Sequence, residues 1–271
     1  MNYINLIAFT ISLLSSYIGS PMILDMLKRG KSTKTNYRGQ EIPIGMGLIF
    51  VLVQFLTLGI IIILKKENFQ YTIFYLFAIS LIGIIGLLDD LTGEEDIKGF
   101  KGHIKSFFKG ILTTGGMKAG VGFLIALFIS IIISDNYVDI IVNTLLIALF
   151  TNLTNLFDLR PGRALKVFIL LSLIMLFSSG IKEYNFILYS FYGILLVYLP
   201  VDLKARAMMG DIGSNVLGIT LGIYCSLTHN IISKLIYLFL LIFIHIIGEK
   251  VSFSSIIEKN KFLSFIDNLG R

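Results

Sequence analysis

The chain has 271 residues, of which 55% are hydrophobic, and it carries a net charge of +6 at neutral pH. A soluble domain usually has fewer than about half apolar residues, and here the apolar residues form repeated runs near the roughly 20 residues that cross a bilayer. These features exclude a soluble globular protein and predict an all-α polytopic membrane protein. The single cysteine, Cys225, lies inside an apolar run, which excludes disulfides and cysteine metal sites.

Nine apolar segments are predicted to cross the membrane as helices of one domain that covers 1–271. In chain order they are 4–27, 44–64, 71–88, 111–134, 138–157, 164–181, 186–201, 214–230 and 231–248. The longer links hold 18 of the 23 basic residues and cover 28–43, 89–110, 158–166, 202–213 and 249–271. Because positive charge stays on the cytoplasmic side, the N-terminus is predicted outside and the C-terminus inside. The positive charge therefore indicates topology, and no nucleic-acid partner is expected.

The first polar cluster in chain order is Asp89-Asp90, where the third apolar segment ends. The helix dipole is negative at this end, so each carboxylate is disfavoured by about 0.3–1 kcal/mol unless a cation is near. A divalent metal ion or a basic partner would remove that cost. The alternative is that the two residues only mark the exit of the helix into water.

A basic stretch follows, with Lys98, Lys101, Lys105 and Lys109 on one face if 98–109 is helical. This stretch could rest on anionic lipid headgroups. One or two of the lysines could also reach a phosphate or diphosphate beside the two aspartates. The two interpretations are compatible.

The next cluster combines amides, an acid and two arginines at the end of the fifth segment. Asn152 and Asn155 lie in its last turns, and a buried amide costs free energy unless it is paired, which indicates a polar pocket. Hydrogen bonding between helices is the alternative for Asn152. Asp158 ends the segment, and Arg160 and Arg163 carry planar groups suited to phosphate or carboxylate.

The last cluster, 209–215, opens the eighth segment with the sequence Met-Gly-Asp-Ile-Gly-Ser-Asn. A helix N-terminus with nearby glycines offers free backbone N–H groups to an anion. Asp211 could serve a metal site here, or it could be only the N-cap of the helix. Lys118 and Asp139 lie near the ends of predicted spans, and both are expected to snorkel to the membrane surface.

The order and spacing of three motifs resemble the polyprenyl-phosphate N-acetylhexosamine-1-phosphate transferases, the family that includes the phospho-N-acetylmuramoyl-pentapeptide transferase. These motifs are Gly-Leu-Leu-Asp-Asp at 86–90, Asn-Leu-Thr-Asn-Leu-Phe-Asp at 152–158 and Met-Gly-Asp-Ile-Gly-Ser at 209–214. The resemblance implies transfer of a sugar 1-phosphate from a UDP-sugar to a polyprenyl phosphate in a bacterial cytoplasmic membrane, with release of UMP. It also implies that the lipid-linked product is used for cell-envelope synthesis. Membrane lipids are the other expected partners, and a homodimer is an open alternative.

The resemblance also implies roles for individual residues. It assigns Mg²⁺, with Mn²⁺ as an alternative, and catalysis to Asp89, Asp90 and Asp211. It assigns substrate binding to Asn155, Asp158, Lys98, Lys101 and Lys105. The polar character of the 152–163 cluster adds Asn152, Arg160 and Arg163 as further candidates for substrate binding.

Two departures from the family pattern concern the donor. The family places a second acid after the fifth segment where this chain has Pro161, and the stretch from His245 to Lys250 has no histidine cluster. We therefore expect altered donor recognition, with Arg160 and Arg163 replacing the lost contacts. A non-catalytic paralogue that binds lipid phosphate is the alternative. A transporter is disfavoured because it needs access from both faces of the membrane, and the outer links are too short to form a substrate entrance there.

Overall fold

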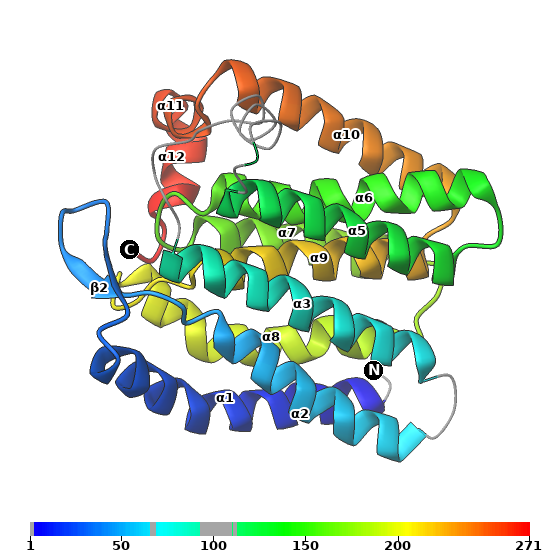
Figure 1. Cartoon of the computed structure of the whole chain (residues 1–271), viewed down its shortest axis with the longest axis horizontal. Helices are drawn as coiled ribbons and strands as arrows, with labels where there is room; N and C mark the ends of the chain where they lie inside the picture. Colours follow the sequence, from blue (N-terminus) through cyan, green and yellow to red (C-terminus); the bar gives the residue numbers. More distant parts are fainter. Residues whose placement is uncertain (1–2, 66–68, 93–109, 111–112) are drawn as a thin grey trace.

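The computed structural model describes residues 3–65, 69–92, 110 and 113–271, which form a bundle of helices with a small sheet at one end (Figure 1). The helices are α1 (Tyr3–Arg29), α2 (Leu48–Lys65), α3 (Gln70–Thr92), α5 (Thr114–Ile133), α6 (Tyr137–Phe157), α7 (Arg163–Ser178), α8 (Asn185–Leu203), α9 (Gly210–Thr228), α10 (Ile231–Lys250), α11 (Phe253–Lys259) and α12 (Lys261–Asn268). Strands β1 (Thr33–Thr35) and β2 (Glu41–Pro43) pair antiparallel, with Lys34 opposite Ile42.

The predicted all-α polytopic membrane fold is confirmed. Within the described part of the chain, seven helices are long and apolar enough to cross a membrane, namely α1, α2, α3, α5, α6, α8 and α10. The other two predicted segments are also helical, as α7 and α9. The 16 residues of α7 rise only about 1.5 Å each, which is short of the roughly 30 Å hydrocarbon layer. Nine spans therefore stay a prediction.

Three parts of the backbone differ from the sequence prediction. The link 28–43 contains the β1–β2 hairpin, the tail after α10 folds into α11 and α12, and α9 begins at Gly210 instead of 214. The earlier start of α9 follows from long-range backbone pairing. The Met208 N–H donates to Pro43 O at 2.8 Å, and the Met46 N–H donates to Met208 O at 3.0 Å. Hydrogen bonds between distant segments do not change the hydrophobic periodicity of the local sequence, so the sequence pattern could not predict this start.

Helix α9 is the centre of the bundle, with 17 of its 19 residues buried. Its glycines let neighbouring backbones approach closely, as in other membrane helix contacts. A Cβ atom on Gly218 would lie 2.3 Å from Phe150 O of α6, and one on Gly47 would lie 2.2 Å from the Gly213 Cα. These contacts fix α9 against α6 and against the start of α2.

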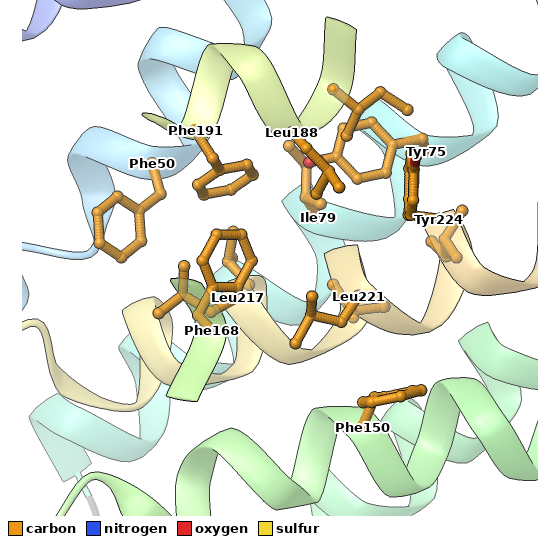
Figure 2. Close-up of a cluster of buried hydrophobic side chains, with 14 of the residues drawn as sticks. Phe50, Tyr75, Ile79, Phe150, Phe168, Leu188, Phe191, Leu217, Leu221 and Tyr224 are labelled. Carbon is orange, nitrogen blue, oxygen red and sulfur yellow. The ribbon is translucent and has the colours of Figure 1, made fainter. Parts of the chain in front are cut away.

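Aromatic side chains fill the space between α9 and the surrounding helices (Figure 2). The rings of Phe50 and Phe191 have centroids 5.9 Å apart, and those of Phe168 and Phe191 are 5.1 Å apart. A hydrogen bond of 3.0 Å joins the Tyr75 hydroxyl of α3 to Thr220 Oγ1 of α9. This packing sets the relative positions of the helix ends that form the site.

Candidate active site

Five aspartates line one pocket of about 340 Å³ at the end of the bundle that carries the hairpin. They are Asp89 and Asp90 at the end of α3, Asp158 after α6, Asp202 at the end of α8, and Asp211 in the first turn of α9. The structure thus brings together the four aspartates, Asp89, Asp90, Asp158 and Asp211, that the sequence analysis identified at the ends of apolar segments. Acidic groups at the ends of membrane helices usually mark a functional site.

Lys118 of α5 links two of these carboxylates. Its Nζ lies 2.5 Å from Asp211 Oδ2 and 3.2 Å from Asp89 Oδ2. The prediction that Lys118 snorkels to the membrane surface is wrong, because the attraction of two carboxylates draws the ammonium group into the pocket. Asp139 Oδ1 lies 3.9 Å from the Nζ of Lys234, a residue of α10 that is only 7% exposed. Snorkelling of Asp139 to the membrane surface stays a prediction.

Asn155 completes the group around Lys118. The amide of Asn155 is assigned the orientation in which both its nitrogen and its oxygen form hydrogen bonds. In this orientation Asn155 donates to Asp211 Oδ1 at 2.8 Å and accepts from Lys118 Nζ at 3.3 Å. Asn152 is exposed on α6 and does not line the pocket. The expected burial of the Asn152 amide is therefore wrong, and the polar pocket predicted for amides holds for Asn155.

Asp90 has a different environment from its neighbour Asp89. Its Oδ1 accepts a hydrogen bond from the Asp211 N–H at 2.8 Å, and its Oδ2 accepts one from the Ile212 N–H at 3.3 Å. Asp90 therefore accepts hydrogen bonds from two N–H groups of the first turn of α9, where the helix dipole favours an acidic side chain. The alternative that Asp211 is the N-cap is wrong, because the helix begins at Gly210 and Asp211 lies within its first turn.

Asp202 was missed by the sequence analysis. It is 5% exposed, its Oδ2 accepts a hydrogen bond from the Gly162 N–H at 2.5 Å, and its Oδ1 accepts one from the Tyr198 hydroxyl at 3.2 Å. These contacts hold the loop 158–162 against the end of α8. The signal that singled out the other aspartates, an acid at the end of an apolar segment, would also have identified Asp202.

Asp158 lies in the pocket between these groups. Burial, together with the negative charges of Asp202, Asp211 and Asp90, raises the pKa of the Asp158 carboxyl group well above its usual value. An approaching cation would relieve this repulsion and restore the charged form. The pocket therefore favours a ligand that brings positive charge.

The two arginines of the 158–163 loop have different roles. Arg160 lines the pocket, with its guanidinium carbon 4.8 Å from the centre of the Tyr37 ring. Arg163 is 4% exposed, and its Nε and Nη2 donate to Asp267 at 2.8 and 2.9 Å. It does not line the pocket of the aspartates. The geometry gives no support to substrate binding by Arg163.

The ion pair of Arg163 and Asp267 joins the start of α7 to α12. Burial acts to raise the pKa of Asp267, but hydrogen bonds and positive charge from Arg163 and Arg271 outweigh it and lower the pKa to about 2. Asp267 therefore stays ionised at neutral pH.

The hairpin supplies a wall of the pocket that the sequence did not reveal, including Lys34 of β1 and Tyr37 of the turn. Both residues lie in the link 28–43, which the sequence analysis used only for its basic charge. The predicted substrate-binding residues Lys98, Lys101 and Lys105 lie outside the described residues.

Comparison with known families identifies the chain. Residues 71–229 match the family model described as glycosyl transferase family 4, while no curated protein matches the sequence. The matched region covers more than half of the chain and runs from α3 to the end of α9, so it contains all five pocket aspartates and Lys118. The chain therefore belongs to glycosyl transferase family 4, whose general chemistry is the transfer of a phospho-sugar to a polyprenyl phosphate.

Proposed function

We propose that this protein transfers an N-acetylhexosamine 1-phosphate from a UDP-sugar to a polyprenyl phosphate at the cytoplasmic face of a bacterial membrane. An oxygen of the lipid phosphate attacks the sugar-bearing phosphorus of the donor, the bond to the α-phosphate breaks, and UMP leaves. The lipid-linked product would serve cell-envelope polymer synthesis. The observation that carries the proposal is the pair of carboxylates, from α3 and α9, that meet at Lys118 in the pocket.

The donor set fits a Mg²⁺ ion, with Mn²⁺ as an alternative. In the described part of the chain, no group of three or more His, Cys, Asp or Glu side chains is arranged to hold a metal. Mg²⁺ usually takes only one or two carboxylates and completes its shell with water and substrate phosphates. Asp89 and Asp211, whose oxygens already face one ammonium group, would hold it. Bound there, the ion would neutralise charge on the diphosphate.

Asp90 enters this proposal mainly as a positioning residue. Both of its oxygens accept backbone hydrogen bonds from α9, so it fixes the turn that carries Asp211. Direct metal binding by Asp90, which the family resemblance implies, stays a prediction.

Lys118 and Asn155 orient the reacting groups. Phosphoryl transfer depends chiefly on alignment and on charge stabilisation. Lys118 places a positive charge beside both carboxylates, where phosphate oxygens of the donor or the acceptor would lie. Asn155 contacts Lys118 and Asp211 and so holds their relative position.

We assign the donor to the side of the pocket formed by the hairpin and the 158–162 loop. Arg160, Tyr37 and Lys34 lie there, and an arginine fork suits phosphate. Asp158 is placed to contact the nucleotide or sugar. Substrate binding by Asn152, Arg163, Lys98, Lys101 and Lys105 stays a prediction.

The test is release of UMP by purified protein in nanodiscs with undecaprenyl phosphate, Mg²⁺ and a panel of UDP-N-acetylhexosamines. We expect release with one donor and its loss in Asp89→Asn and Asp211→Asn. Asp139→Asn is the matched control, because Asp139 lies at the opposite end of α6 from Asp158. No release with any donor from a folded protein would favour the non-catalytic paralogue.

A further inference from the structure

Helix α12 turns the carboxylate of Asp267 toward the protein. Asp267 is only 9% exposed and binds the guanidinium groups of Arg163 and Arg271. Lys166 Nζ donates to the backbone oxygens of Ile266 and Asp267 at 2.8 and 2.7 Å. The charged contacts of this helix therefore face inward.

The opposite side of α12 exposes a continuous apolar stripe. It consists of Phe262, Phe265 and Ile266 of α12 and of Leu269, the residue that follows the helix, which are 70%, 66%, 38% and 58% exposed. The spacing of three and four residues from Phe262 to Phe265 and Ile266 places these three on one helical face. In a water-soluble protein an amphipathic helix turns its apolar face to the core, so α12 has the reverse orientation. An apolar surface of this kind marks an interaction site.

The location of α12 favours lipid as its partner. The preceding helix α10 is a candidate membrane span that ends at Lys250, and only residues 251–260 separate it from α12. The short helix α11 lies between them, and its Phe253 ring stacks 4.9 Å from Phe157 at the end of α6. Figure 1 shows α11 and α12 at the end of the bundle where β2 also lies. The stripe is thus close to the surface of the bilayer.

The charges beside the stripe also suit a membrane surface. Lys250 precedes the two short helices, and Lys259 and Lys261 stand at the junction between them, all exposed. Basic residues next to a bilayer are attracted by anionic headgroups. A helix with an aromatic stripe on one side and flanking lysines is typical of interfacial membrane binding.

We propose that α12 is an interfacial anchor whose stripe inserts among the lipids of the leaflet at the pocket end of the bundle. The anchor also supports the pocket, because Arg271 binds Asp267 of α12 and its Nε donates to Pro161 O at 2.7 Å. Pro161 lies in the loop that carries Asp158 and Arg160. Contact with the bilayer on one side of α12 is therefore coupled to the position of this loop on the other.

The test uses the full-length protein in nanodiscs of phosphatidylcholine and phosphatidylglycerol. A fluorophore is attached at Phe262→Cys or Phe265→Cys, with Asn268→Cys as the matched control, since Asn268 is exposed but lies off the stripe. The native Cys225 is fully buried in α9 and should not react in the folded protein. Quenching is measured with nitroxide-labelled acyl chains and with aqueous iodide.

We expect lipid nitroxides to quench the labels at 262 and 265 at least twice as strongly as the label at 268, and iodide to show the reverse order. Strong iodide quenching at 262 and 265 would overturn the anchor, because the stripe would face water. Protection from both quenchers would also overturn it and would point to a protein partner, such as a second copy of the chain. These readouts do not depend on transferase activity.

Discussion

Asp90 caps the helix that carries Asp211, through a hydrogen bond of 2.8 Å from the Asp211 N–H to Asp90 Oδ1. Asp89, its neighbour in sequence, instead contacts Lys118. The two adjacent carboxylates thus have separate tasks, one toward the backbone of α9 and one toward the charged centre of the pocket. Their substitutions should differ accordingly.

Asp90→Ala should destabilise the protein by about 0.5–2 kcal/mol, because it removes the side-chain acceptor for the first turn of α9. Asp89→Ala should change stability less and abolish UMP release. Unfolding can be followed by the reaction of the buried Cys225 with a thiol-reactive dye, which suits a chain with no tryptophan. Equal loss of stability in both variants would contradict the separate tasks.

Lys118→Met should lower UMP release by on the order of 10²-fold, the cost of removing one stabilising charge or donor from an active site. The same change should increase the apparent affinity for Mg²⁺, because Asp89 and Asp211 lose the ammonium group that they share. Lys118→Arg keeps the charge and should retain part of the activity. An unchanged Mg²⁺ requirement in Lys118→Met would argue that the metal lies elsewhere.

Asp158→Asn should stabilise the ligand-free protein at pH 7–8. The folded protein raises the pKa of Asp158 through burial and the neighbouring negative charges. The free energy of unfolding therefore falls as the pH rises from the pKa of the unfolded chain, about 3.9, toward the pKa in the folded protein. The neutral amide avoids that loss, and the gain should vanish near pH 4. A gain of 1 kcal/mol would raise Tm by about 2–4 °C. Donor binding should weaken in the same variant.

Asp267→Asn should cost about 3 kcal/mol, because it leaves the buried guanidinium of Arg163 without a counter-charge. The folded state lowers the pKa of Asp267 to about 2, so the contribution of the ion pair is present above about pH 4 and is lost as the pH falls toward 2. Asp25→Asn is the control, since the Asp25–Arg29 pair is exposed and should contribute little. Equal unfolding temperatures of the two variants would exclude the predicted role.

Gly218→Ala should destabilise the bundle by about 1–3 kcal/mol through overpacking, because its Cβ would meet Phe150 O at 2.3 Å. Gly120→Ala in α5 is the matched helical control, with no atom within 4 Å of the new Cβ. It should stabilise the protein by about 0.4–1 kcal/mol by reducing the freedom of the unfolded chain. A similar effect of both substitutions would contradict the close packing of α9 on α6.

The convergence of the aspartates could be predicted because it depends only on which end of each helix carries the acid. Alternating helix direction places the ends of α3 and α6 and the start of α9 at the same end of the bundle. The inward direction of Lys118 depends on the rotation of α5 about its axis, which the sequence pattern does not specify. The Asp90 cap depends on hydrogen bonds between segments more than a hundred residues apart. The β1–β2 hairpin consists of short strands without a clear hydrophobic period.

The burial of α9 also bears on how the protein is inserted during synthesis. This helix is rich in glycine, serine and threonine, and it is not among the seven helices of the described residues that are apolar enough to cross a membrane on their own. A segment of this kind gains little from contact with lipid. Its favourable contacts are with α3 and α6, both of which are synthesised earlier. Entry of α9 into the bilayer should therefore wait until those helices have assembled. Substitutions on α3 or α6 that weaken contact with α9 should then reduce the amount of protein that is correctly inserted.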